Sequence, residues 1–404
     1  MTEADMVTPP RGLALAQIAL GLGGLFIGTG EFAAMGLLPG MAHSAGVSVP
    51  GAGNLISAYA LGVVVGSPLL AVVTARMEKR KLLLLLAALV LIGNAASALA
   101  PGFIGIAGAR FLAGLPHGAY YGTASIVAAS MVPASQRAQA IGRVMLGLAA
   151  ANLIGVPLTT WLGQSFGWRS AFAVVAIGGA LLLVMLRFLI PTIKADQDAA
   201  PLRELSAFAS VQIWLTLAVA TIGFGGMFAV YSYIAPTLTE ETGVSQSAVP
   251  IFLALWGLGM VVGNIAGGWL ADRALIPAII GIIVWNVVFL AVFFFAAHGP
   301  ITAGASLFMI GVGFALVPAL QARLMDVARH AQSLAAAMNH SAFNLSNAIG
   351  AWTGGLAIAA GYGWASTGLV GAALAAGGLA IMALSVLLIR RGRGSKPSLK
   401  ETEA

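Results

Sequence analysis

The 404-residue sequence contains no cysteine and very few charged side chains. The absence of cysteine excludes disulfides, thiolate metal sites and cysteine nucleophiles. Charged residues make up only 8% of the chain, whereas soluble domains carry about 25%. Hydrophobic residues make up 59%, and the mean hydropathy is +0.96. This composition predicts an integral membrane protein.

Long apolar runs divide the chain into twelve segments of about 20 residues or more, the length that spans a bilayer as an α-helix. They are residues 13–38, 50–73, 81–100, 103–130, 138–163, 169–190, 212–236, 248–270, 276–297, 301–324, 333–358 and 365–389. The first run exceeds the apolar core of a cleavable signal peptide, which has about 7 to 15 residues, so we expect it to stay in the membrane. The sequence therefore predicts an all-α membrane protein with twelve transmembrane helices.

The 20 Lys and Arg residues are unevenly distributed around these runs. If both termini are cytoplasmic, all of them lie on the cytoplasmic side except Arg169, in a short outer loop, and Arg110, within the fourth run. This positive-inside bias predicts cytoplasmic termini. The net charge of +7 is then explained by the ends of the helices rather than by a nucleic-acid partner.

A repeat relates the two parts of the chain. At an offset of 197 residues, segment 60–66 (ALGVVVG) aligns with 257–263 (GLGMVVG), and Pro39 aligns with Pro236. A repeat of six helices predicts two halves in one orientation, with a central cavity between them. The predicted boundaries are 1–192 for the N-terminal half, 193–210 for a cytoplasmic linker, 211–390 for the C-terminal half and 391–404 for a basic cytoplasmic tail. Paired glycines in these helices, such as Gly62 and Gly66, predict close helix contacts.

Several motifs together resemble the major facilitator superfamily: ARFLAGLPHGAYYG (109–122) in the fourth run and GNIAGGWLADR (263–273) after the eighth. More narrowly, GTGEFAAMGLLPGMA (28–42) and SAFNLSNAIGAWTGG (341–355) are similar to its drug:proton antiporter branch, which holds bacterial arabinose and sugar efflux and chloramphenicol-resistance exporters. The resemblance covers essentially the whole chain. It implies the two-half facilitator fold, a bacterial inner-membrane location and secondary transport of a small molecule.

Glu31 and Arg110 lie inside apolar runs and are the first candidates for function. A charge at the centre of a spanning helix costs about 2.5 to 3.5 kcal/mol on insertion scales, so such residues normally face the protein interior. A helix rise of 1.5 Å per residue puts both about 10 Å below the outer surface, so they can pair, directly or through water. The resemblance associates Arg110 with proton coupling, and a carboxylate that gains or loses a cationic neighbour changes its affinity for protons. The alternative is a static ion pair that orients two helices.

His117 shares one helix face with Arg110, Gly114 and Tyr121, at spacings of 3 or 4 residues. It falls near the membrane midplane, where transporters bind substrate. An imidazole changes charge near neutral pH, so His117 is a candidate proton carrier or substrate-binding group. The alternative is a packed histidine at a helix irregularity.

A polar stripe on the eleventh run provides candidates for substrate binding, because His340, Asn344 and Asn347 follow the i, i+4, i+7 spacing of one helix face. Together with residues of other helices, the predicted substrate-binding set is Tyr121, Asn152, Tyr231, Trp256, His340, Asn344 and Asn347. The alternative is that the amides join helices by hydrogen bonds and that the aromatic residues are core or belt residues.

A cytoplasmic latch is predicted from Arg76, Asp272 and Arg273, which occupy equivalent loops of the two halves. The first loop has alanine before its arginine, where the second has aspartate. The carboxylate of such a latch must therefore come from Asp272 or from Glu78.

These features favour a secondary exporter, in which protons enter through Glu31 while a small organic solute leaves by alternating access. With one buried carboxylate and one buried arginine, neutral solutes such as sugars, nucleosides or amphenicols are preferred over cationic drugs. Uptake by proton symport would use the same residues. A membrane enzyme or a sensor is a further alternative, but we predict no catalytic residue, metal or cofactor, and no phosphate-binding loop is present. The expected partners are protons, the solute and the bilayer, and we expect a monomer.

Overall fold

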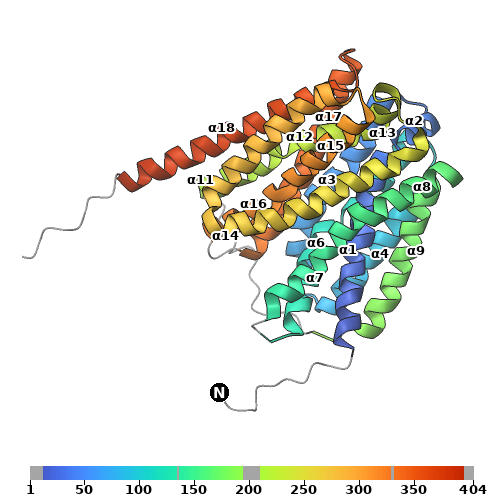
Figure 1. The fold of residues 1–404 in the computed structure, drawn as a ribbon. Helices are drawn as coiled ribbons and strands as arrows, with labels where there is room; N and C mark the ends of the chain where they lie inside the picture. The colour runs from blue at the N-terminus through green and yellow to red at the C-terminus, as the bar shows by residue number, and fades with distance from the viewer. Residues whose placement is uncertain (1–11, 134–135, 194–209, 329–331, 395–404) are drawn as a thin grey trace, which may run out of the picture.

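The computed structural model describes residues 12–133, 136–193, 210–328 and 332–394, which form helices and no strand (Figure 1). The N-terminal set comprises α1 (Leu13–Gly36), α2 (Leu38–Ala45), α3 (Val49–Val73), α4 (Lys79–Leu99), α5 (Gly102–Gly114), α6 (His117–Ser130), α7 (Arg137–Ala150), α8 (Val156–Phe166) and α9 (Arg169–Leu189). The C-terminal set comprises α11 (Val211–Ala218), α12 (Gly225–Ser232), α13 (Ile234–Pro236), α14 (Val249–Ala296), α15 (Pro300–Val312), α16 (Leu316–Ala328), α17 (Gln332–Ala359) and α18 (Ser366–Gly394).

Every predicted apolar run coincides with helix, and nine helical segments of the described chain are long and apolar enough to cross a membrane. The fourth run is broken between α5 and α6, where Pro116 lacks the N–H that would continue the helix. The eighth and ninth runs merge into α14 across a kink at Ala274 (φ −158°, ψ 83°). The polar stripe of α17 lowers the mean hydropathy of that helix, so α17 is not among the nine segments. The all-α membrane fold is confirmed, and twelve crossings stay a prediction.

Two predicted boundaries fall near the limits of the described chain. Of the linker 193–210, only the two end residues are described. The helix α18 continues to Gly394, so the tail predicted from residue 391 begins as the last helical turn.

Glycine contacts show that the repeat extends to helix packing. Gly114 on α5 lies against the main-chain oxygen of Tyr59, and Gly311 on α15 lies against that of Trp256. A Cβ atom at either glycine would collide with that oxygen. Both pairs are related by the offset of 197 residues, as are the close-contact glycines Gly62 and Gly259, and Gly66 and Gly263. The helix α3 therefore crosses α5 as α14 crosses α15, and the predicted close approach is confirmed.

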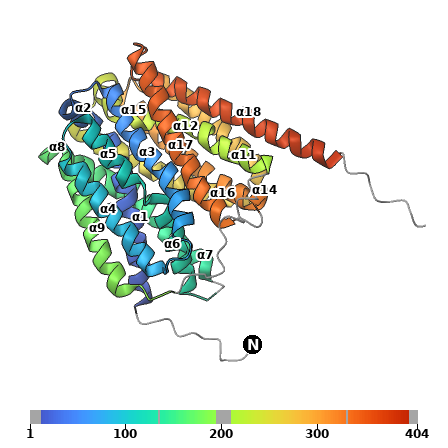
Figure 2. The same cartoon turned by 180° about the vertical axis from the view of Figure 1, so that it is seen from behind.

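The two sets meet at the end of the molecule that carries α2 and α13, which we call the α2 end (Figure 1). From there α3 and α17 run side by side (Figure 2). Hydrogen bonds between the sets join Gln164 to the Gln246 oxygen (2.9 Å), Ser57 to the Ala348 oxygen (3.4 Å) and Tyr233 to the Pro50 oxygen (3.5 Å). Toward the other end, Arg143 bonds within one set, to Gln17.

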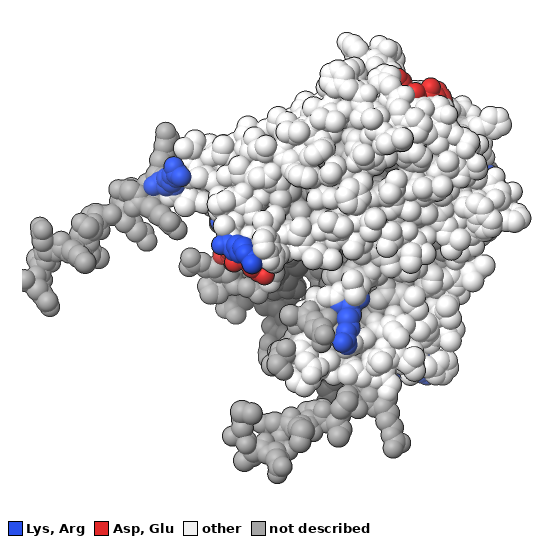
Figure 3. All heavy atoms as spheres, viewed as in Figure 1, with Lys and Arg blue, Asp and Glu red and all other residues white. Residues whose placement is uncertain are grey.

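The molecular surface has a wide uncharged region. Figure 3 shows most of the visible Lys and Arg along one edge, with acidic groups beside one of them, further acidic groups at the opposite corner, and a wide uncharged face between. Large apolar side chains are exposed on many helices, including Phe188 and Ile265. An apolar surface of this extent would be unfavourable in water, so the chain is a multi-pass membrane protein.

Candidate functional site

The buried carboxylate of Glu31, on α1, contacts both sets of helices. Only 4% of the residue is exposed. Its Oε2 lies 3.5 Å from Nδ1 of His117 on α6. Its Oε1 accepts a hydrogen bond from Nδ2 of Asn347, on α17 of the C-terminal set, at 3.3 Å. A carboxylate removed from water requires such partners, and here each set supplies one.

Arg110 is fully buried but does not pair directly with the Glu31 carboxylate. Its guanidinium donates to the main-chain oxygens of Gly30 (2.8 Å) and Glu31 (3.1 Å). The cation also lies over the rings of Tyr59 (4.5 Å) and Phe172 (4.9 Å). The carboxylate turns toward His117 and Asn347 instead, so a Glu31–Arg110 pairing through water stays a prediction. Arg110 fixes α1 against α5.

Aromatic and imidazole rings surround His117. Its Nδ1 is also 3.2 Å from the hydroxyl of Tyr59. Its ring centroid lies 5.1 Å from that of Tyr121 and 5.9 Å from that of His340, and the last two rings stack at 5.4 Å. We call Glu31, Tyr59, His117, His340 and Asn347 the carboxylate cluster. It brings together two predicted proton-coupling residues, two predicted substrate-binding residues and Tyr59, which the sequence analysis missed.

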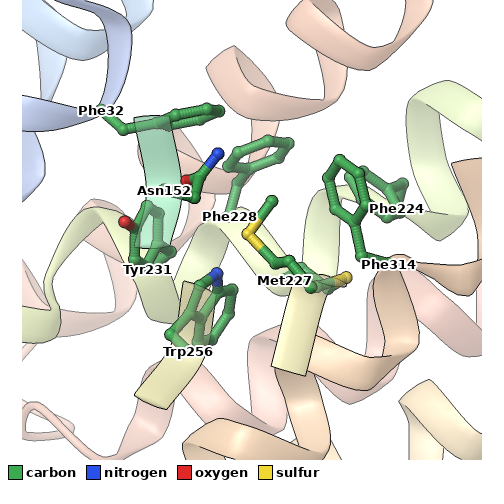
Figure 4. A pocket seen from close by; sticks show the side chains of 9 residues that line it. Phe32, Asn152, Phe224, Met227, Phe228, Tyr231, Trp256 and Phe314 are labelled. Carbon is green, nitrogen blue, oxygen red and sulfur yellow. The ribbon is translucent and has the colours of Figure 1, made fainter. Parts of the chain in front are cut away.

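A separate aromatic pocket lies beside Glu31. Its walls are Phe32, Asn152, Phe224, Met227, Phe228, Tyr231, Trp256, Met260 and Phe314 (Figure 4). Phe32, the residue after Glu31, stacks with Phe228 at 6.2 Å, and Tyr231 stacks with Trp256 at 4.6 Å. The free space measures about 10 Å³, roughly the room for one water molecule. The pocket is therefore nearly closed in this structure.

Two polar atoms of this pocket lack a partner. Asn152 is completely buried; its Nδ2 donates to the Leu148 oxygen at 3.0 Å, while its Oδ1 accepts no hydrogen bond. The hydroxyl of Tyr231, a residue 1% exposed, also has no partner. Buried polar atoms without partners are uncommon in proteins, so these two mark positions where a ligand or water would bind.

The pocket contains three of the seven residues predicted to bind substrate: Asn152, Tyr231 and Trp256. The structure places His340 and Asn347 in the carboxylate cluster instead. Tyr121 donates to the Gly24 oxygen at 2.8 Å, and Asn344 donates to the His340 oxygen of its own helix at 3.1 Å. The sequence analysis missed the phenylalanines of the pocket, because apolar residues in an apolar helix give no signal by themselves.

The predicted latch is not formed in this structure. Arg76 and Asp272 are exposed, and Arg273 lies 3.5 Å over the ring of Trp269. Glu78, the alternative carboxylate, pairs with Lys81 at 3.3 Å. Within the described ranges no ion pair involves Arg76, Asp272 or Arg273. The latch stays a prediction for a state in which this end of the molecule closes.

The sequence matches the family model of the Major Facilitator Superfamily over residues 20–351 and again over 236–404. The chain belongs to the Major Facilitator Superfamily. It is 40% identical over 366 residues to the inner membrane transport protein YdhP of Escherichia coli K12, a match that covers 90% of this chain and 94% of YdhP. It is 30% identical over 370 residues to the chloramphenicol resistance protein of Streptomyces lividans, covering 89% and 92% of the two chains.

A solved structure shows the same fold. The nucleoside transporter NupG aligns with a TM-score of 0.75 at 12% identity, over 92% of this chain and 99% of that one. The predicted family resemblance is confirmed. As a member of the Major Facilitator Superfamily, the protein is a membrane transporter and not an enzyme.

Proposed function

We propose that this superfamily member is a secondary exporter that exchanges protons for a small organic solute across the bacterial inner membrane. One observation carries the proposal: the buried Glu31 carboxylate contacts both sets of helices, while the adjacent residue, Phe32, forms a wall of the aromatic pocket. A proton site and a solute pocket that are one residue apart at the junction of two moving units can influence each other.

Protonation of Glu31 changes the contact that joins the two sets. An ionised carboxylate accepts hydrogen bonds, as it does here from Asn347, whereas a protonated carboxyl group also presents a donor. The ionised form therefore favours the arrangement described here, and proton binding favours separation of the sets. One charge that crosses about 150 mV supplies about 3.5 kcal/mol, enough for a solute gradient of a few hundredfold.

The positive-inside bias assigns the α2 end to the outside and both termini to the cytoplasm. The arrangement described here is then closed to the outside. We further propose that residues 1–192 and 211–390 move as two halves of a monomer, and that the latch of Arg76, Asp272 and Arg273 closes the cytoplasmic end when the outside opens.

The names of the two relatives support location and direction, since one is named an inner membrane transport protein and the other a chloramphenicol resistance protein. Uptake by symport would use the same carboxylate. The direction of proton-driven accumulation decides between export and uptake.

The test uses everted membrane vesicles with an imposed pH gradient and a panel of L-arabinose, adenosine and chloramphenicol. We expect accumulation of one of these solutes when the vesicle interior is acidic. Glu31→Gln should abolish accumulation but preserve solute binding, because glutamine keeps the volume and hydrogen bonding but cannot release a proton. Glu241→Gln, which alters a partly exposed carboxylate beside His298, is the matched control. If Glu31→Gln still accumulates solute, proton coupling lies elsewhere.

A further inference from the structure

We infer that the aromatic pocket is the solute-binding subsite and that it selects uncharged molecules with a flat apolar group, rather than polyols or ions. The inference rests on the proposed transport function and specifies its substrate class. It is carried by the repeat, by the composition of the pocket walls and by two unpartnered polar atoms.

The pocket and the carboxylate cluster occupy equivalent places in the two repeats. At the offset of 197 residues, Glu31 corresponds to Phe228, Tyr59 to Trp256 and His117 to Phe314. The matching contacts of Gly114 with Tyr59 and of Gly311 with Trp256 show that the correspondence of Tyr59 with Trp256 is spatial. Each second-repeat residue of these pairs lines the pocket. The place that holds titratable groups in one repeat therefore holds aromatic rings in the other.

Each site is completed by an asparagine from the opposite set. Asn347, on α17, reaches Glu31 of the N-terminal set. Asn152 lies in the π-helical segment Ala151–Gly155, between α7 and α8, and faces the pocket built mostly by the C-terminal set. A solute that binds Asn152 and Tyr231 would therefore bridge the two sets, as the proton site already does.

The walls of the pocket define the chemical class of the solute. None of the nine lining residues is charged, so an ion would lose hydration without gaining a counter-charge. The stacked pair Tyr231 and Trp256 offers a flat apolar face to another ring. The Asn152 Oδ1 and the Tyr231 hydroxyl have no partner in the closed pocket, and separation of its walls would make both available for hydrogen bonding to a solute. A polyol would leave most of its hydroxyl groups unpaired in such walls, which is costly.

The small free space of the pocket is explained by the closed state of its walls. Phe32 and Asn152 belong to the N-terminal set, whereas Phe228 belongs to the C-terminal set, so separation of the sets enlarges the pocket. Met227 and Met260 have flexible side chains that adapt to different shapes. The pocket is thus suited to open around a solute during the transport cycle.

The test measures equilibrium binding to the purified full-length protein in detergent, using four radiolabelled probes. Adenosine and chloramphenicol are uncharged and carry a flat aromatic ring, L-arabinose is an uncharged polyhydroxylated sugar without an aromatic ring, and tetraphenylphosphonium is an aromatic cation. We expect adenosine or chloramphenicol to bind at least about 100-fold more tightly than L-arabinose and tetraphenylphosphonium. Tyr231→Phe and Asn152→Leu should each weaken that binding about tenfold, since each removes a polar partner from a buried ligand.

Tyr120→Phe is the matched control, because the Tyr120 hydroxyl bonds to the Leu20 oxygen outside the pocket. Tighter binding of L-arabinose or the cation overturns the substrate class, and unchanged binding in Tyr231→Phe overturns the site. If neither adenosine nor chloramphenicol binds, the inference is also overturned. Failure of the proposed proton coupling can be distinguished from failure of this inference. The first is measured as proton-driven accumulation by Glu31→Gln, and the second as the preference among the four probes.

Discussion

Asn347, in the C-terminal set, donates a hydrogen bond of 3.3 Å to Glu31, in the N-terminal set. An amide donor binds an ionised oxygen more strongly than a neutral one. The bond therefore makes the contact between the two sets depend on the charge of Glu31. The contact of Glu31 with His117 has no such effect, because both residues belong to the N-terminal set.

Asn347→Leu should uncouple solute movement from the pH gradient. The variant keeps Glu31 and the aromatic pocket, but the second set no longer senses the carboxylate. We expect proton-driven accumulation in everted vesicles to fall about tenfold, the equivalent of about 1.4 kcal/mol, and its dependence on pH to flatten, while solute affinity changes little. Asn286→Leu removes a buried amide that bonds only within the C-terminal set and is the control. Full accumulation in Asn347→Leu would contradict this role.

Arg110→Lys should destabilise the protein. A lysine cannot reproduce the forked contacts with the Gly30 and Glu31 oxygens or the stacking on Tyr59, so we expect a loss of about 2 kcal/mol, seen as a lower thermal transition in detergent. Arg187→Lys changes an exposed arginine near the end of α9 and should have a small effect. An unchanged transition with lost proton coupling would instead assign Arg110 to the proton path.

Gly114→Ala and Gly311→Ala should both destabilise helix packing, since each new Cβ atom meets the main-chain oxygen of a crossing helix. Overpacking of this kind costs about 1 to 3 kcal/mol. Gly108, on the same helix as Gly114, has no atom within 4 Å of a Cβ, so Gly108→Ala is the matched control. The measurement is thermal unfolding in detergent. Equal transitions for all three variants would disprove the close crossing.

Tyr233→Phe should favour opening at the α2 end. The Tyr233 hydroxyl donates to the Ala351 oxygen of its own set at 2.7 Å, and across the junction to the Pro50 oxygen at 3.5 Å, where it also lies against Gly53; its loss therefore weakens a contact at the junction. The chain has no native cysteine, so a single Ala348→Cys reports accessibility to a membrane-impermeant maleimide from outside. We expect labelling to be several-fold faster, consistent with about 1 kcal/mol for one hydrogen bond. Unchanged labelling would show that this hydroxyl does not hold the junction closed.

The sequence alone determined the class of the protein and much of its plan. Composition and run length predict a helical membrane protein, because only segments that satisfy their own backbone hydrogen bonds can cross a bilayer. The motifs identify the superfamily, and the offset of 197 residues indicates the repeat. Glu31 could be selected as a candidate because a charge in an apolar run is costly wherever the helix lies.

The tertiary structure decided which side chains meet. Spacing places Arg110 and Glu31 at one depth, but the rotation of the helices turns the carboxylate toward His117 and Asn347, and the arginine toward main-chain oxygens. In the same way, Asn347 joins the carboxylate cluster while Asn152 faces the aromatic pocket. The period of a helix fixes which residues share its face, but only packing against the other helices fixes where that face points.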